Sequence, residues 1–233
     1  MISIFSFNKT HFEEFLPELW KKLTPHEQCL VKELAFPHLR CERILSFSIV
    51  KILISKILDI SLEKFSIVRL RAKKPYLYTS LKHSIEFSVS HSGDYLLFAF
   101  SQDHPVGIDI EKIHLFSDQM RVVKDHFSNQ EQTHLAAAPN LCEYNARFFS
   151  AWCKKEAYLK GQGQGLVVGN LSAIDTLNQH IDLWKIQSLH APSGYCAALS
   201  FCTNRLCSRV AISQNAVTPT QLKRAMGRSE AMD

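Results

Sequence analysis

One long apolar segment limits the folds that are open to this chain. Between residues 39 and 59, apolar side chains occupy most positions, and polar ones such as Ser48, Lys51 and Ser55 recur at spacings of three and four. This spacing predicts an α-helix that is buried on nearly all sides except along one narrow polar stripe. Such a helix needs other elements packed around it, so the chain must build a sizeable core.

The segments around this helix predict a mixture of strands and further helices. Strand-like patterns occupy residues 2–7, 65–70, 85–90, 95–101 and 106–111, and then 181–188, 195–202 and 207–212. Other helical patterns occupy 117–126, 128–137 and 143–160. Ser92-Gly93-Asp94 has the composition of a tight turn, which makes residues 85–101 a hairpin. The order of elements predicts an α+β fold with a coarse two-fold recurrence.

The recurrence divides the chain into three expected parts. We expect an N-terminal α+β half over residues 1–105 and a C-terminal α+β half over residues 106–213. Residues 214–233 are polar and contain Pro219 and Gly227, which predicts a loose tail.

Composition excludes several classes of protein. The chain of 233 residues is 46% apolar and 21% charged, which is ordinary for a globular protein. It has no apolar run long enough to cross a membrane and no secretory signal at its start. Its seven cysteines are scattered singly, which favours reduced thiols in a cytoplasmic protein. A net charge of +5 without a basic run favours anionic small molecules or acidic proteins as partners; we expect neither nucleic acid nor membrane binding.

The segment Val106-Gly107-Ile108-Asp109-Ile110-Glu111 alternates apolar and acidic residues. In a strand, Asp109 and Glu111 point to one face while Ile108 and Ile110 point to the other. Two neighbouring carboxylates repel one another, and a divalent cation such as Mg²⁺ relieves the repulsion. By itself the pattern is more often the ordinary alternation of a half-buried strand.

A further acidic residue that could take part in catalysis lies on the helix predicted over 143–160. Trp152, Glu156 and Lys160 share one face of that helix at spacings of four. Taken alone, Glu156 and Lys160 could form an exposed ion pair. Three glycines follow within residues 161–165, which indicates either a flexible helix end or a close approach of the backbone to a ligand.

Three further segments carry candidate ligands for an anion. Ser90 and His91 lie at the tip of the hairpin, where their hydroxyl and imidazole could donate hydrogen bonds. A hydrolase triad is disfavoured, because adjacency in sequence does not bring a Ser–His couple into contact or supply an orienting acid. Lys74 precedes Pro75 in a basic loop, and Arg43 lies on the buried helix, where an internal ion pair is the alternative role.

These segments, taken in order, resemble the 4′-phosphopantetheinyl transferases, in particular the surfactin-synthetase-activating type. The resemblance is carried by K-P-Y, F-S-V-S-H-S-G, V-G-I-D-I-E-K, F-S-N-Q-E and W-C-K-K-E-A-Y-L-K-G-Q-G-Q-G-L, and extends from about Arg43 to Gly165. It implies a pseudo-two-fold pair of similar α+β subdomains in one chain, a monomer, with coenzyme A in the cleft between them. It also implies transfer of the 4′-phosphopantetheine arm to a serine of an acyl or peptidyl carrier protein, with release of adenosine 3′,5′-bisphosphate.

The resemblance also implies roles for individual residues. Asp109, Glu111 and Glu156 match Mg²⁺ ligands, and Lys160 matches a lysine that contacts the phosphates. Residues that match contacts to coenzyme A are Arg43, Lys74, Ser90 and His91. Glu131 matches an acidic residue assigned to deprotonating the attacking serine. Between the two glutamates, we favour Glu156 as both metal ligand and base, with Glu131 holding or activating a metal-bound water.

Two other functions remain open at this point. A non-catalytic module that binds coenzyme A or a carrier protein predicts the loss of one metal carboxylate, but all three are present. A Mg²⁺-dependent phosphodiesterase predicts a basic track with interleaved aromatic residues, which the sequence lacks.

Overall fold

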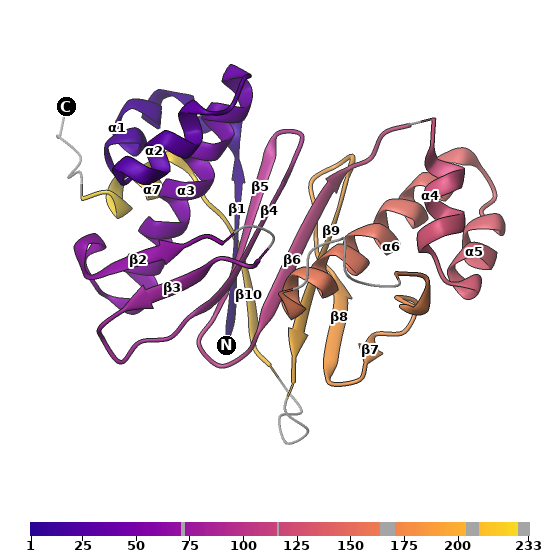
Figure 1. Cartoon of the computed structure of the whole chain (residues 1–233). Helices are drawn as coiled ribbons and strands as arrows, with labels where there is room; N and C mark the ends of the chain where they lie inside the picture. The colour runs from indigo at the N-terminus through magenta and orange to yellow at the C-terminus, as the bar shows by residue number, and fades with distance from the viewer. Residues whose placement is uncertain (71–72, 116, 164–170, 204–209, 228–233) are drawn as a thin grey trace.

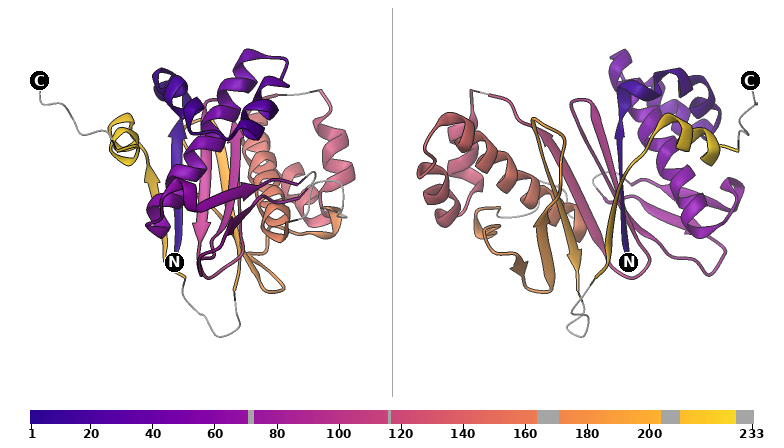
Figure 2. Two further views of the ribbon diagram at one scale, coloured as in Figure 1. Left: turned by 60° about the vertical axis from the view of Figure 1, so that its left-hand side comes forward. Right: turned by 180° about the vertical axis from the view of Figure 1, so that it is seen from behind.

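The computed structural model describes residues 1–70, 73–115, 117–163, 171–203 and 210–227. Two four-stranded sheets stand next to each other in the middle of the molecule, and helices cover their outer sides (Figure 1). The views in Figure 2 show the same arrangement from the side and from behind. The predicted α+β class is therefore confirmed.

The first half contains the long helix expected near residues 39–59. Its strands are β1 (Ile2–Asn8), β2 (Phe65–Val68), β3 (Tyr76–Thr79), β4 (Glu86–Ser92) and β5 (Tyr95–Ser101). Its helices are η1 (Lys9–Phe15), α1 (Leu16–Lys21), α2 (Pro25–Lys32), α3 (Pro37–Leu58) and η2 (Leu62–Lys64). Strands β2 and β3 form a separate hairpin.

The second half repeats the plan around a second long helix. Its strands are β6 (Val106–Lys112), β7 (His180–Ile181), β8 (Trp184–Ser188) and β9 (Tyr195–Cys202), and its helical segments are α4 (Gln119–His126), α5 (Asn129–Ala136), α6 (Leu141–Gln162) and η3 (Leu171–Ala173). In each half the first strand pairs antiparallel with the last, and the last pairs with the one before it. This shared pairing order is the predicted two-fold recurrence.

Alternation along β6 decides which residues reach the site. Ile108 and Ile110 pack between the two sheets against Ile2 and Leu97 of the first half. Because successive side chains of a strand point to opposite faces, Asp109 and the residues two positions away point to the other face, which α6 covers.

Residues 214–227 do not form the expected loose tail, and the rest of that range, 228–233, lies outside the described residues. Strand β10 (Ile212–Ala216) pairs parallel with β1, and α7 (Pro219–Ala225) packs on the first half, where Leu222 is buried. The prediction failed because β10 is a polar strand at the edge of a sheet. A signal for α7 was present, since Thr218-Pro219-Thr220-Gln221 forms a capping box with proline at the start of the helix.

Two smaller expectations also differ from the structure, and one strand was not expected. The strand expected over 181–188 is two strands, β7 and β8, because the chain turns at Asp182, whose φ is 52°. The strand expected over 207–212 falls partly on residues 204–209, which lie outside the described residues, and β10 begins only at Ile212. Strand β3 was not predicted.

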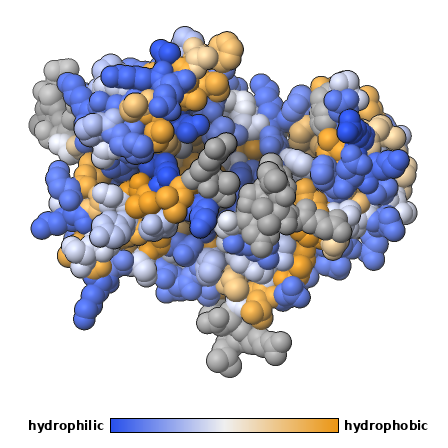
Figure 3. Space-filling model, in the orientation of Figure 1, coloured by the Kyte–Doolittle hydropathy of each residue, from blue (hydrophilic) through white to orange (hydrophobic). Residues whose placement is uncertain are grey.

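The described surface is mixed in polarity. The face in Figure 3 is predominantly hydrophilic, and its apolar residues are divided into separate patches over both halves. Among the described residues, no helix has the length and apolar character needed to cross a bilayer.

Candidate active site

Two glycines bring α6 unusually close to β6. A Cβ atom added at Gly107 of β6 would lie 1.9 Å from the backbone oxygen of Ala157 and 2.3 Å from the backbone nitrogen of Gly161. Only glycine fits at position 107 with the helix so near. This close approach places Glu156 of α6 over the face of β6 that carries Asp109 and Glu111.

Asp109 is the buried centre of this group. One carboxylate oxygen, Oδ1, accepts hydrogen bonds from Lys160 Nζ at 2.6 Å and from Ser90 Oγ at 2.7 Å. Lys160 Nζ also lies 2.9 Å from Ser90 Oγ. The other oxygen, Oδ2, is buried and has no hydrogen-bond partner. A buried carboxylate oxygen without a donor is costly, so Oδ2 marks a position where a ligand or cation would stabilise the site.

The charges of the group act on one another. Burial and then the charge of Asp109 raise the pKa of Glu111, which Ser92 partly offsets by donating a hydrogen bond of 2.8 Å. Burial, followed by the charge of Asp109, raises the pKa of Glu156 to about 7. Burial alone would lower the pKa of Lys160, but Asp109 and the two glutamates outweigh it and raise that pKa.

The carboxylate side chains of this group are suitable ligands for a divalent cation, but they are not already arranged around a cation position. No three His, Cys, Asp or Glu side chains within the described ranges stand ready as a metal cage. The fit comes instead from the unpartnered Oδ2 of Asp109 and from two further carboxylates, whose pKa values are raised by burial and then by the charge of Asp109. Oxygen donors of this kind suit Mg²⁺, which takes few protein ligands and keeps several waters.

Of the residues expected at coenzyme A, Arg43 lies on α3 and His91 lies on β4. Arg43 is exposed and stacks on Phe47, 5.3 Å from the ring centroid. His91 is exposed and forms an ion pair of 3.0 Å with Glu42. The pKa of Glu42 is lowered to about 2, chiefly by its hydrogen bond to His91. Glu42 was not singled out from the sequence, because its role depends on the contact between α3 and β4.

Two other residues of that expected set have structural partners. Ser90 is 4% exposed, and its hydroxyl bonds to Asp109 and Lys160, so it belongs to the carboxylate group. Lys74 donates to Glu86 at 2.8 Å and to the backbone oxygen of Val106 at 2.9 Å, which joins the starts of β4 and β6.

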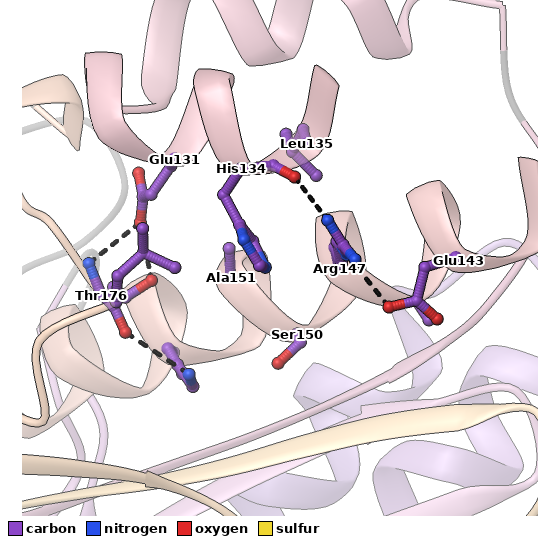
Figure 4. A pocket seen from close by; sticks show the side chains of 11 residues that line it. Glu131, His134, Leu135, Glu143, Arg147, Ser150, Ala151 and Thr176 are labelled. Carbon is purple, nitrogen blue, oxygen red and sulfur yellow. Dashed lines mark hydrogen bonds and ion pairs between the residues drawn. The ribbon is translucent and has the colours of Figure 1, made fainter. Parts of the chain in front are cut away.

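The structure separates Glu131 from the carboxylate group, so we do not retain it as a base or as a holder of water. It caps α5 and accepts two hydrogen bonds from Thr176 (Figure 4). It also forms an ion pair of 2.7 Å with Lys155, which is fully buried. Lys155 also donates to the backbone oxygens of Leu171 and Ile174. Together, Glu131 and Lys155 hold residues 171–176 against α5 and α6.

The hollow beside Glu131 is a different feature from the carboxylate group. It has a volume of about 250 Å³ and is lined by α5, α6 and the segment near Thr176. Arg147 on its wall is held by Glu143 and by the backbone oxygen of His134 (Figure 4). The face of α6 that lines the hollow lies opposite the face that carries Glu156, because Arg147 and Glu156 are nine positions, or two and a half turns, apart on the helix.

Comparison with known proteins gives matches along most of the chain. The profile described as the 4′-phosphopantetheinyl transferase superfamily matches residues 105–209, and the one described as 4′-phosphopantetheinyl transferase, N-terminal, matches residues 9–103. The 4′-phosphopantetheinyl transferase Sfp of Bacillus subtilis is 38% identical over 80 residues, which is 34% of either chain. A putative 4′-phosphopantetheinyl transferase of Synechocystis is 29% identical over 149 residues, 57% of this chain and 60% of the relative.

A relative from an animal matches as well. The L-aminoadipate-semialdehyde dehydrogenase-phosphopantetheinyl transferase of Xenopus laevis is 29% identical over 117 residues, 47% of this chain and 39% of the relative. The two profiles match one half of the chain each, and the chain belongs to the 4′-phosphopantetheinyl transferase superfamily. The matched segments span about a third to three-fifths of the length of these curated relatives.

Proposed function

We propose that this protein transfers the 4′-phosphopantetheine arm of coenzyme A to a serine hydroxyl of an acyl or peptidyl carrier protein. Membership of the superfamily gives the class of reaction. The observation that carries the proposal within this chain is the buried, unpartnered Oδ2 of Asp109, among two further carboxylates and a lysine. A diphosphate substrate needs such a combination, because its transfer depends on neutralising negative charge.

Asp109, Glu111 and Glu156 are the proposed Mg²⁺ ligands. When bound, the ion supplies positive charge against the diphosphate oxygens of coenzyme A. Lys160 adds a fixed positive charge beside the same oxygens, and its contact with Asp109 keeps it oriented until the substrate arrives. Arg43, His91 and Lys74 are the proposed contacts to the nucleotide part of coenzyme A.

Glu156 is also the proposed general base. A serine hydroxyl is a poor nucleophile at neutral pH, and removing its proton contributes roughly 10²- to 10⁴-fold to the rate. Without a bound cation, burial and then the charge of Asp109 raise the pKa of Glu156 to about 7. A bound cation would lower this pKa and keep Glu156 ionised, as a general base must be. Glu131 is not needed in this scheme.

The proposed partner is an acidic carrier protein. A net charge of +5 favours electrostatic docking of such a protein. We further propose a monomer, since two similar halves already lie together within one chain, and a cytoplasmic location, since coenzyme A and carrier proteins meet there.

The test is to incubate the protein with coenzyme A, Mg²⁺ and a set of apo-carrier proteins and to weigh the carriers by mass spectrometry. The expected result is a gain of one phosphopantetheine arm, which EDTA abolishes and excess Mg²⁺ restores. A folded protein that binds coenzyme A yet leaves every carrier unchanged would favour a non-catalytic binding module and contradict the proposal.

A further inference from the structure

Strands β4 and β6 lie side by side where the two halves meet (Figure 1), but they belong to different sheets. Serine hydroxyls of β4, instead of backbone oxygens, accept hydrogen bonds from the backbone of β6. Ser88, Ser90 and Ser92 of β4 each accept a hydrogen bond from a backbone N–H of β6, at 3.1, 3.4 and 3.0 Å, and each donor lies 20 residues further along the chain. The constant offset fixes the register of β6 against β4.

Two of the three serines do more than join the strands. A serine hydroxyl has one proton to donate, and the backbone N–H groups of Ile110 and Lys112 occupy only acceptor positions of Ser90 and Ser92. Their protons go to carboxylates: Ser90 donates to Asp109, and Ser92 donates to Glu111 Oε2 at 2.8 Å. Ser88 has no carboxylate within hydrogen-bond distance among the interactions of the described residues and only accepts from Ile108.

We propose that Ser92 is a positioning residue for the metal site: its hydroxyl, fixed by the backbone of Lys112, holds the Glu111 carboxylate in the orientation in which it binds a divalent cation. This inference rests on the proposed function. Glu111 is partly exposed, and without an anchor its side chain would sample several rotamers. Groups that orient a metal ligand in this way typically contribute roughly 10- to 100-fold to metal affinity.

The strand itself supplies a matched control. The variant S88A removes the same type of backbone contact as S92A, but no carboxylate loses a donor. The variant S92T keeps a hydroxyl at the position of interest. A purely structural role for the ladder therefore predicts similar behaviour of S88A and S92A, whereas a positioning role separates them.

The experiment measures binding of Mn²⁺ to the full-length protein by electron paramagnetic resonance, since carboxylate sites of this kind also accept Mn²⁺. We expect roughly 10- to 100-fold weaker binding in S92A and affinities near that of the wild type in S88A and S92T. Coenzyme A affinity in the absence of metal should be unchanged in all three variants, and thermal unfolding verifies that each is folded.

Two results would overturn the inference: unchanged Mn²⁺ affinity in S92A, or an equal loss in S88A. A wild-type protein that binds no Mn²⁺ would overturn it as well. If the wild type binds Mn²⁺ and yet modifies no carrier protein, the proposed function fails, and the comparison of S92A with S88A still decides the role of Ser92.

Discussion

Glu156 is a buried carboxylate, 9% exposed, that faces two other carboxylates. Its pKa rises from 4.5 to about 7 on folding, chiefly through burial and then through the charge of Asp109. Between these two values the folded protein keeps a proton that the unfolded chain has released. The free energy of unfolding therefore falls as the pH rises from about 4.5 to 7.

The variant E156Q tests this loss of stability, since glutamine has nearly the same shape as glutamate and no charge. We expect the stability of E156Q relative to the wild type to increase by about 2 kcal/mol as the pH is raised from 5 to 8. The measurement is urea denaturation of both metal-free proteins at the two pH values. A stability difference that does not change with pH would show that the pKa of Glu156 is not raised in the folded protein.

The sequence was most informative at residues whose chemistry depends on local alternation. Asp109 and Glu111 could be placed on one face of a strand, and Glu156 and Lys160 on one face of a helix, from spacing alone. The partners of Glu131 could not be predicted, because Lys155 and Thr176 reach it only through packing of α5 against α6. A capping box signal was present at Ser128 and Glu131, but a cap can coexist with a catalytic role.

At the scale of elements, the distance between α6 and β6 depends on Gly107, which faces the backbone of α6 at Ala157 and Gly161. An added methyl group at Gly107 would meet backbone atoms of Ala157 and Gly161, which cannot move without shifting the helix. An added methyl group at Gly161 would meet side-chain atoms of Trp184 and Ser200 instead of backbone atoms.

The variant G107A should therefore lose about 1–3 kcal/mol of stability and most of its transfer activity, since α6 carries Glu156 and Lys160 away from β6. The variant G161A is the control, and we expect a smaller loss of both. Unfolding by urea and the mass assay on a carrier protein measure the two effects. Equal tolerance of both substitutions would show that close packing here does not position the site.

Elements with strong local signals were predicted well, and weakly marked ones were not. The long helices α3 and α6 and the hairpin of β4 and β5 follow the predicted ranges closely, because periodicity and turn residues agree there. Strand β3 was missed because its residues alternate between exposed and half-buried, with Tyr76 and Tyr78 largely exposed, so no apolar face marks it.

At the scale of the whole molecule, β10 and α7 return to the half in which the chain begins. Strand β10 adds to the first sheet beside β1, and Leu222 of α7 is 1% exposed within the core under α3. The first half is therefore completed by residues from the C-terminal end, and a cut after residue 105 would leave its core without α7.

The variant L222A tests that contribution. Removing this buried side chain should lower the free energy of unfolding by about 2–5 kcal/mol. The control is T220A on the exposed side of the same helix, where we expect little change. Chemical denaturation of both variants decides the matter, and a wild-type stability of L222A would mean that α7 does not contribute to the core.

The central claim is that carboxylates from β6 and α6 act as one unit on the substrate. The most direct measurement compares the initial rates of carrier modification by the wild type, D109N, E156Q and the double variant. If both side chains serve one metal site, each single variant loses roughly 10³-fold or more, and the double variant loses little beyond that. Losses that multiply in the double variant, or a single variant with a rate near that of the wild type, would contradict the account.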